Sequence, residues 1–395
     1  MNQLFQQIKD ASRALALVDD GQRNRLLEHL AEAILANQTM LLDANRLDLK
    51  QMDNQDPLYD RLLLTPERLQ GIASDMRHVA SLPSPLGIIT KERTLPNGLH
   101  LRRVSVPFGV IGVIYEARPN VSFDVFSLCF KSGNACLLKG SRNAQHSNEA
   151  IAGLILQTLQ AEGLPKAVAM MPPTHEATAE LLSAVGYVDL CIPRGGKNLI
   201  RFVRDNARVP VIETGAGVVH AYFDKRGDLE KGRAIICNAK TRRVSVCNAL
   251  DCLLIHKDRL ADLPALLAPM KDKVTIHMPQ PDEPFDWDRE WMSYDLSIRA
   301  VDSIDEALQH IQAHGSGHSE CIITEDAEAA LRFQREVDAA CVYVNAPTSF
   351  TDGAQFGLGA EIGISTQKLG PRGPMALEEM TTYKWLINGN GQVRS

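Results

Sequence analysis

The feature that most constrains the fold is a regular alternation of short apolar runs with helical segments between residues 108 and 213. The apolar runs are rich in Val, Ile, Leu and Cys, and they lie at 108–115, 135–140, 167–172, 188–193 and 209–213. Near-continuous apolar strands that alternate with helices are typical of a parallel sheet covered on both faces. Such sheets bind ligands at the carboxyl ends of their strands. The pattern therefore predicts an α/β domain with a ligand site at the carboxyl ends of the strands.

The segments on either side of this region are also regular. Leu and Ile recur at helical spacing through 26–35, and Thr65-Pro66 has the form of a helix start, with a capping hydroxyl and a proline in the first turn. β-Prone runs alternate with helical segments again from 218 to 345. Since a chain of 395 residues is expected to form more than one domain, these runs predict a second α/β domain.

A hairpin is predicted over residues 88–106. Its arms flank Pro96-Asn97-Gly98, and Asn-Gly is the strongest short sequence signal for a hairpin. The arms carry Lys91, Arg93, Arg102 and Arg103, so we expect an exposed ribbon. Another β-prone run, TTYKWLING, lies near the end of the chain at 381–389.

Charge and composition exclude several classes of protein. Lys and Arg total 42 against 48 Asp and Glu, and a net charge of −6 gives no electrostatic footprint for nucleic acid or an anionic membrane. There is neither a signal-peptide pattern nor an apolar run of ~18 residues, so a cytoplasmic protein is expected. The eight cysteines contain no CxxC pair, which favours buried, reduced thiols and no metal site.

Cys247 is the cysteine with the strongest case for chemistry. Lys240, Arg242 and Arg243 precede it by a few residues, and neighbouring cations lower the pKa of a thiol toward the reactive thiolate. Asn248 follows it directly. The alternative, that Cys247 is a buried structural thiol, is not excluded by spacing alone. For the three cations the alternative is a solvated helix end.

An anion site is predicted where the apolar run at 135–140 leads into a helix. Lys139, Gly140, Ser141 and Arg142 lie at this junction. A helix start offers free N–H groups, and the glycine allows close approach of a phosphate. The lysine, serine and arginine could hold the ribose and 2′-phosphate of NADP. An ordinary solvated loop is the alternative.

Gly195-Gly196 forms a second candidate, again between an apolar run and a helix, although it could equally be a turn. Two other patterns are interpreted as coincidental. Gly357–Gly363 resembles a dinucleotide fingerprint but lacks the preceding strand that such a fingerprint requires. His314 and His318 have metal-like spacing without a third ligand nearby, so we expect surface histidines.

Five segments, at 107–124, 131–144, 192–200, 238–249 and 359–385, carry a family resemblance. Through them the chain resembles the aldehyde dehydrogenase superfamily, and most closely the γ-glutamyl phosphate reductases, over essentially its whole length. The resemblance implies a Rossmann-type cofactor domain, an α/β catalytic domain and a small β oligomerisation element. We place these at 1–216, 217–375 and 376–395, with the 88–106 hairpin projecting from the first to pair with the C-terminal strand.

The resemblance also implies roles for particular residues. Cys247 corresponds to the nucleophile, and Lys139 to the lysine that holds the adenosine ribose. Ser141 and Arg142 lie where the 2′-phosphate of NADP would bind. The remaining cofactor contacts expected are Gly140 beside Lys139, Gly195 and Gly196 near the pyrophosphate, and Glu290 at the nicotinamide ribose.

One departure from the superfamily concerns the oxyanion. Hydrolytic members carry an asparagine loop where this chain has Tyr115–Pro119. Backbone N–H groups near Cys247, or Arg118 or Asn120, would have to replace that amide. Glu213 lies near the position of the glutamate that activates water, but an acyl-phosphate reductase needs no such water. Substrate contacts are expected from Arg118, Asn120, Lys240, Arg242 and Asn248.

The reaction implied is the reduction of L-glutamyl 5-phosphate to L-glutamate 5-semialdehyde with NADPH, the second step of proline biosynthesis from glutamate. A homo-oligomer is expected, as is functional pairing with the glutamate 5-kinase that makes the substrate. Two alternatives remain: a hydrolytic NADP-dependent aldehyde dehydrogenase, and a cysteine-dependent acyl transferase or hydrolase without a redox step. Dependence of the reverse reaction on inorganic phosphate distinguishes the reductase from the first alternative. Absence of NADPH binding to the pure protein would favour the second.

Overall fold

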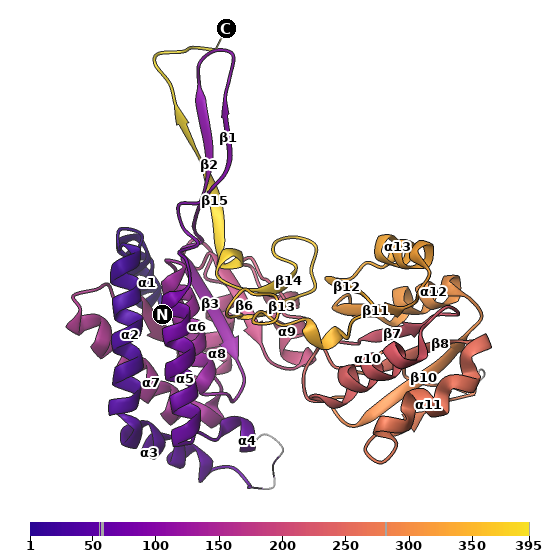
Figure 1. Ribbon diagram of the computed structural model, residues 1–395. Helices are drawn as coiled ribbons and strands as arrows, with labels where there is room; N and C mark the ends of the chain where they lie inside the picture. The colour runs from indigo at the N-terminus through magenta and orange to yellow at the C-terminus, as the bar shows by residue number, and fades with distance from the viewer. Residues whose placement is uncertain (55, 57–58, 281–282, 395) are drawn as a thin grey trace. The chain divides into compact units, whose positions relative to one another are not determined.

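The computed structural model describes residues 1–54, 56, 59–280 and 283–394 (Figure 1). They form two compact units. The first unit contains Met1–Ile212, Leu358–Gly363 and the chain from Met375 onward, and the second contains Glu213–Gly357 and Ile364–Pro374. The predicted catalytic domain, 217–375, differs because residues 358–363 return to the first unit. There Gly359 packs so closely that an added Cβ would lie 2.6 Å from Cδ2 of Leu82.

A four-stranded parallel sheet forms the centre of the first unit. Its order is β5-β4-β3-β6, and its strands are β3 (Val110–Tyr115), β4 (Ala135–Lys139), β5 (Val168–Met170) and β6 (Leu190–Arg194). Four of the five predicted apolar runs therefore form strands. The fifth, 209–213, makes only a bridge between Cys191 and Val211, because Pro210 has no N–H to extend a ladder.

Helices cover this sheet. Those that follow the strands are α6 (Asn120–Lys131), α7 (Gln145–Ala161), α8 (His175–Leu182) and α9 (Lys197–Asn206). Those that precede it are α1 (Asn2–Leu15), α2 (Asp20–Ala36), α3 (Gln38–Leu49), α4 (Tyr59–Leu62) and α5 (Pro66–Ser81). Thr65 caps α5 as predicted, since its Oγ1 accepts from the N–H of Arg68 at 3.2 Å.

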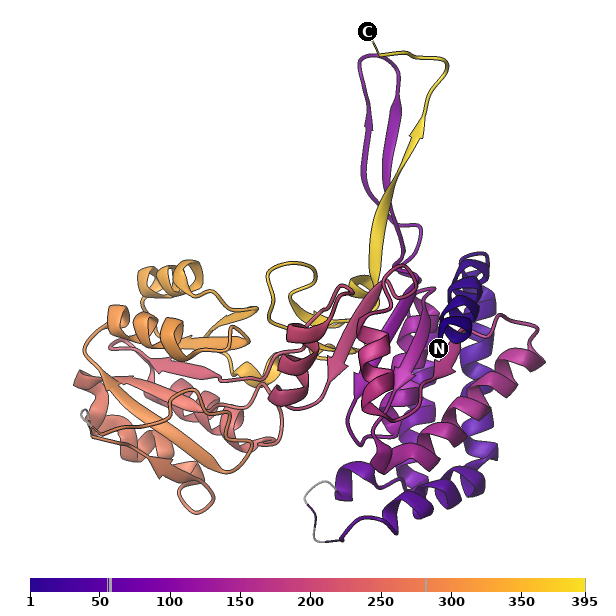
Figure 2. The ribbon, with the colours of Figure 1, turned by 180° about the vertical axis from the view of Figure 1, so that it is seen from behind.

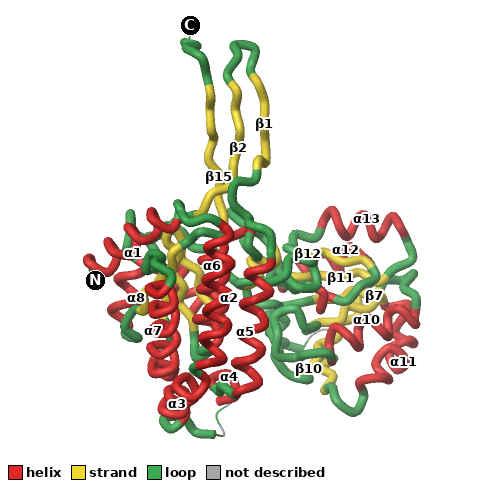
Figure 3. Tube along the Cα trace, turned by 60° about the vertical axis from the view of Figure 1, so that its left-hand side comes forward, coloured by secondary structure: helices red, strands yellow, loops and turns green. Residues whose placement is uncertain are grey.

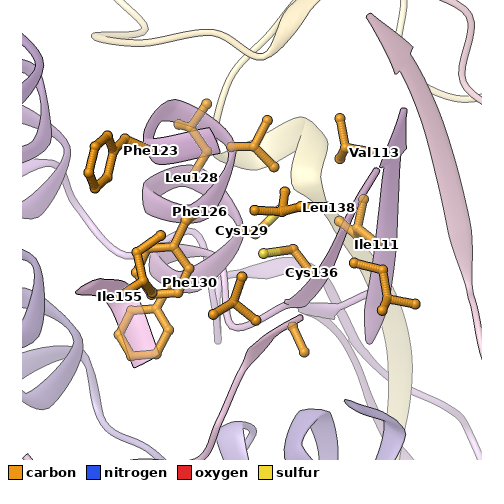
Figure 4. Close-up of a cluster of buried hydrophobic side chains, with 14 of the residues drawn as sticks. Ile111, Val113, Phe123, Phe126, Leu128, Cys129, Phe130, Cys136, Leu138 and Ile155 are labelled. Carbon is orange, nitrogen blue, oxygen red and sulfur yellow. The ribbon is translucent and has the colours of Figure 1, made fainter. Parts of the chain in front are cut away.

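Part of the core of the first unit lies between α6 and the sheet (Figure 4). Phe126 and Phe130 of α6 stack with their ring centroids 5.2 Å apart. Cys129 and Cys136 are buried beside them, as Cys191 is in β6. Burial of these thiols agrees with the prediction that most of the cysteines are small core residues.

The predicted hairpin and C-terminal strand form one three-stranded antiparallel sheet, which we call the arm. It contains β1 (Ile89–Thr94), β2 (His100–Pro107) and β15 (Thr381–Asn388) in the order β1-β2-β15. Both views of the ribbon and the tube show the arm extending from the rest of the first unit (Figures 1, 2 and 3). All of β1 is exposed.

The second unit contains a six-stranded parallel sheet in the order β12-β11-β7-β8-β10-β9. The strands are β7 (His220–Phe223), β8 (Cys252–His256), β9 (Thr275–His277), β10 (Asp295–Val301), β11 (Ser319–Ile323) and β12 (Cys341–Val344). The helices are α10 (Leu229–Thr241), α11 (Leu263–Leu267), α12 (Ile304–His314) and α13 (Ala327–Glu336). The β-prone runs predicted from 218 to 345 all contain one of these strands.

A separate two-stranded sheet pairs β13 (Gly363–Ser365) with β14 (Gly373–Met375). Among the described residues, no helix combines the length and hydrophobicity that a bilayer span requires.

Candidate functional site

Cys247 lies in a turn between α10 and β8, and its side chain is half-buried. None of the eight cysteines, all of which are described, forms a disulfide, and only Cys237 shares this partial exposure. A thiol in a turn can meet a substrate, whereas the six buried thiols cannot. The accessibility of Cys247 is therefore consistent with the nucleophile predicted at this position.

The turn is held by residues that follow it. Asn248 is buried, and its Nδ2 donates to the carbonyl oxygen of Thr351 at 2.9 Å. In return Thr348 Oγ1 donates to the Asn248 carbonyl at 2.9 Å. Thr348 opens the short helix η4 (Thr348–Phe350). The side chain of Asn248 thus fastens the turn to this segment, and its predicted contact with substrate remains a prediction.

Gly217 contacts the turn on another side. A Cβ at this position would lie 1.6 Å from the carbonyl oxygen of Cys247, so only glycine fits. The Gly217 N–H donates to Oε1 of Glu290 at 3.0 Å. The Glu290 carboxylate is therefore hydrogen-bonded to Gly217, whose main chain packs against Cys247. Its predicted contact with a nicotinamide ribose stays a prediction.

A buried carboxyl group, that of Asp251, is hydrogen-bonded to the residue that follows this glutamate in the chain. Asp251 Oδ1 accepts from the N–H of Trp291 at 3.0 Å, and its Oδ2 accepts from the N–H of Val219 at 3.3 Å. Burial raises the pKa of Asp251 to about 7 despite these donors. This carboxyl group links the start of β8 to the segment before β10.

The predicted substrate cations occupy different environments. Lys240 is 0% exposed, and its Nζ donates to the Leu250 carbonyl at 2.9 Å, which closes the loop that contains Cys247. Burial lowers the pKa of this ammonium group. Arg242 is exposed and lines a cavity of about 400 Å³ together with Arg233 and Asn238. Lys240 would have to leave Leu250 before it could contact a substrate.

The predicted nucleotide residues gather at the carboxyl end of β4. Lys139 ends the strand, and Ser141 caps the short helix η1 (Arg142–Ala144) by accepting from the N–H of Asn143 at 3.2 Å. Burial, and then the charge of Arg142, lower the pKa of Lys139. A Cβ at Gly140 would lie 2.2 Å from Asn148 Nδ2, so a larger residue here would have to displace the Asn148 side chain.

Gly140 and Ser141 line a cavity of about 290 Å³. Its other walls come from α7 and from the residues at and after the end of β5: Gln145, Asn148, Glu149, Met170, Met171, Pro172 and Pro173. The cavity thus lies at the carboxyl ends of two neighbouring parallel strands, where ligands of such sheets bind. Apolar walls with a few polar groups suit a nucleotide base and ribose.

The remaining first-unit residues lie at the ends of β3 and β6. These strands are paired, with Tyr115 opposite Arg194. Gly195 follows β6 and lies against Glu116, because an added Cβ would be 2.6 Å from the Glu116 carboxyl carbon. Gly196 is the N-cap residue of α9. Arg118 is exposed, and Asn120 begins α6, where its Nδ2 donates to Asp124 at 3.0 Å.

Sequence reasoning missed several of these contacts. Gly217, Thr348 and Thr351 belong to segments that read as ordinary loops, and nothing local to them indicates a partner at Cys247. The prediction of surface histidines was wrong for His318, which is 0% exposed because it immediately precedes the inner strand β11. His314 pairs with Asp288 at 2.8 Å.

Comparisons with known proteins extend this picture. A model of the aldehyde dehydrogenase family matches residues 296–386. A curated gamma-glutamyl phosphate reductase from Bacteroides thetaiotaomicron is 57% identical over 412 residues, covering 100% of this chain and 99% of the relative. One from Chlorobium chlorochromatii is 55% identical, with 100% and 99% of the two chains covered.

Solved structures agree. The gamma-glutamyl phosphate reductase of Thermotoga maritima matches with a TM-score of 0.96 and 38% identity, covering 99% of each chain. An engineered glycolyl-CoA reductase with bound NADP+ matches with a TM-score of 0.69 and 17% identity, covering 98% of this chain and 96% of the other. At that identity the second match shows the fold alone, which is the aldehyde-dehydrogenase-like fold that the sequence predicts.

Proposed function

This chain belongs to the γ-glutamyl phosphate reductase family, within the aldehyde dehydrogenase superfamily, and from that premise we propose its reaction and the residues that perform it. It reduces L-glutamyl 5-phosphate to L-glutamate 5-semialdehyde and phosphate with NADPH, in the biosynthesis of proline. The observation that carries this proposal is 57% identity to a gamma-glutamyl phosphate reductase over the whole chain.

Cys247 is the proposed nucleophile. Its thiolate attacks the acyl carbonyl carbon, the bond from that carbon to the phosphate oxygen breaks, and phosphate leaves with the electron pair. The resulting thioester divides one difficult reduction into two steps. After reduction, the carbon–sulfur bond of the thiohemiacetal breaks, which releases the aldehyde and regenerates the thiolate. The half-buried turn that contains Cys247 supports this role.

NADPH supplies the hydride when it is bound. The junction formed by Lys139, Gly140, Ser141 and Arg142 suits a nucleotide, because Gly140 and Ser141 line a cavity of about 290 Å³ at the carboxyl ends of two parallel strands. Arg142 and Ser141 would hold the 2′-phosphate, and Lys139 the ribose. Gly195 and Gly196 would approach the pyrophosphate, and Glu290 the nicotinamide ribose.

The 2′-phosphate assignment has a direct test. Arg142→Ala should weaken NADPH binding about tenfold or more, because hydrogen bonds to charged groups contribute about 1.5–3 kcal/mol, while NADH binding changes little. Arg46→Ala, an exposed arginine on α3 that pairs with Asp43, is the matched control. Equal losses for the two cofactors would remove Arg142 from this role.

The developing oxyanion and the leaving phosphate need hydrogen-bond donors, each worth about 3 kcal/mol when preorganised. Arg118, Asn120, Arg242 and the main-chain N–H groups near Cys247 are the proposed donors. Lys240 and Asn248, also predicted as substrate contacts, use their side-chain donors on main-chain carbonyls. We therefore propose the arginines, Asn120 and the main-chain N–H groups, and not Lys240 or Asn248, as the donors.

The reverse reaction tests the proposed chemistry. With glutamate 5-semialdehyde and NADP+, NADPH should form only when inorganic phosphate is present, because phosphate must release the acyl group from the cysteine. Oxidation that proceeds without phosphate would identify a hydrolytic aldehyde dehydrogenase instead. A pure protein that binds no NADPH would favour an acyl transferase or hydrolase.

Cys247→Ala should abolish turnover and leave NADPH affinity near that of the unchanged protein. Cys237→Ala is the matched control, since Cys237 is the other half-buried cysteine. Activity retained in the Cys247 variant would exclude the thioester mechanism.

Family membership also supports three wider proposals. The protein acts in the cytoplasm, it forms a homo-oligomer through the arm, and it works together with the glutamate 5-kinase that makes its substrate. Exposed strands β1 and β15 at the edges of the arm support the second of these, because unpaired edge strands invite pairing with another chain.

A further inference from the structure

Three buried polar residues lie in one row across the sheet of the second unit. Glu320 of β11 is registered with His220 of β7, and His220 is registered with Cys252 of β8. Directly opposed residues on neighbouring strands point to the same face of a sheet. Helix α12 packs beside that face, where Leu308 and Ile311 join Cys252 in one apolar cluster (Figure 1). His310 of α12 completes the group.

The donor atoms of this group are close together. One potential ligand atom from each of His220, Cys252 and His310 lies within 4.8 Å of the others, and Cys252 Sγ is 3.8 Å from His310 Nε2. A zinc ion with tetrahedral bonds of about 2.3 Å to sulfur and about 2.1 Å to nitrogen would hold a sulfur and a nitrogen ligand about 3.6 Å apart. The three residues are only 0%, 2% and 3% exposed. Their spacing is therefore near that of a coordination sphere.

His220 presents a lone pair that nothing described satisfies. Its Nδ1 lies 3.1 Å from Oε2 of Glu320, which also accepts from the His220 main-chain N–H at 2.8 Å. A carboxylate partner places the ring proton on Nδ1, so Nε2 is left as an acceptor. Nε2 is buried without a hydrogen-bond partner among the described residues. A buried, unsatisfied acceptor is costly, and a cation would satisfy it.

His310 is restrained differently. Its Nδ1 lies 3.0 Å from Nη1 of Arg299, and a guanidinium can only donate. The proton of the neutral ring is therefore on Nε2, which faces Cys252. A metal must displace that proton, and Arg299 must then turn fully to Glu306, to which its Nη2 already donates at 3.1 Å. Arg299 thus competes with a metal for this ring.

We propose that His220, Cys252 and His310 bind one divalent transition-metal ion of the zinc class. Two imidazoles and a thiolate form a borderline-soft donor set, which suits zinc better than magnesium or calcium. The carboxylate of Glu320 behind His220 is the outer partner that metal-bound histidines commonly have. Bound metal would tie β7, β8 and α12 together just after the turn that contains Cys247. This inference is independent of the proposed reaction.

Metal uptake tests the proposal directly. Protein carrying Cys247→Ser, which removes the reactive thiol as a competing ligand, is stripped with a chelator and titrated with Co²⁺ and then Zn²⁺. One equivalent should bind and give a thiolate-to-cobalt absorption band that zinc abolishes. The band should be lost on adding Cys252→Ser or His220→Gln, and kept on adding Cys321→Ser, another buried cysteine of the same sheet.

Two further variants examine the surroundings of the site. Glu320→Gln should weaken zinc binding about tenfold or more, as loss of an outer partner does. Arg299→Gln should strengthen it, because the amide oxygen can accept the proton that moves to His310 Nδ1. No uptake by the Cys247→Ser protein, a band that survives Cys252→Ser, or weaker binding by Arg299→Gln would each overturn the proposal. Absence of metal uptake by the Cys247→Ser protein would overturn the proposal even if one of the other variants fails to fold.

Discussion

At the scale of single residues, the turn that contains Cys247 depends on Gly217, a residue with no reactive side chain. Gly217 approaches the Cys247 carbonyl oxygen so closely that a Cβ would lie 1.6 Å from it. The obstructing atom is main chain, so the turn itself must shift to make room. A displacement of about 1 Å would take the proposed nucleophile out of alignment with the acyl carbon.

Gly217→Ala should therefore lower kcat by about a hundredfold, since a displacement of about 1 Å at a reacting group has an effect of this size. Steady-state kinetics measures the loss, and thermal unfolding checks that the protein still folds. Gly71→Ala in α5 is the matched control, because nothing lies within 4 Å of its added Cβ. A kcat equal to that of the control would show that the turn does not depend on this contact.

Asp251 is the second residue with a measurable consequence. Burial raises its pKa in the folded protein to about 7, whereas an unfolded aspartate titrates near about 4. The stability that its protonation contributes is complete below about pH 4 and is lost as the pH rises through about 7. Above that pH the folded protein must hold a buried carboxylate.

Asp251→Asn should remove this pH dependence. The free energy of unfolding of the unchanged protein, relative to the variant, should fall by about 2–4 kcal/mol between about pH 4 and about pH 7, at about 1.4 kcal/mol per unit of pKa difference. Denaturant unfolding at several pH values measures it, with Asp272→Asn, on the surface, as the control. Parallel pH profiles for the Asp251 variant and the unchanged protein would contradict the assignment.

At the scale of elements, the start of α7, beside the proposed nucleotide cavity, is stabilised by a residue of another helix. Ala144, at its N-cap, offers no side-chain cap. Asp48 of α3 takes that role, since its carboxylate accepts from the N–H groups of His146 and Ser147 at 3.0 and 2.8 Å. A carboxylate also favours the positive end of the helix dipole.

Asp48→Ala should destabilise the protein by about 2–4 kcal/mol, because it leaves buried helix N–H groups without partners. Urea unfolding measures the change. Asp43→Ala is the control on the same helix, where the side chain is 57% exposed, and should cost less than about 0.5 kcal/mol. Equal effects at the two positions would exclude the cap as the cause.

At the scale of the whole molecule, the arm leaves apolar side chains exposed. Tyr383, Trp385 and Ile387 alternate along β15, so they share one face, and they are 55%, 38% and 58% exposed. Contiguous exposed apolar residues on a sheet with free edges mark an association surface. We expect at least a dimer that buries this face.

Replacing Trp385 and Ile387 by Asp should dissociate the oligomer, since two buried charges would oppose association. Light scattering coupled to size exclusion gives the mass of each form. Lys384→Asp, which lies on the opposite face of the strand, should leave the oligomer intact. An unchanged mass in the double variant, or a monomeric parent protein, would show that the arm is not the interface.

The sequence by itself determined most of the strands and the family to which the chain belongs. Apolar periodicity predicted four strands of the first sheet and all six of the second, and Asn97-Gly98 predicted the hairpin, because these signals depend on residues close together in the chain. Residues 135–142 predicted a nucleotide site at one strand–helix junction. Five segments, one of them around Cys247, carried the family resemblance, and that resemblance led to the proposal that Cys247 is the nucleophile.

Only the tertiary structure decided which distant residues meet. Gly217 and Thr348 contact the turn that contains Cys247. Asp48 caps a helix that begins about a hundred residues later in the chain. Cys252 of β8 contacts His310 of α12. Burial of His318 and the missing strand at 209–213 also depended on neighbours that no local pattern names. Such contacts are set by sheet register and packing, which a short window of sequence does not contain.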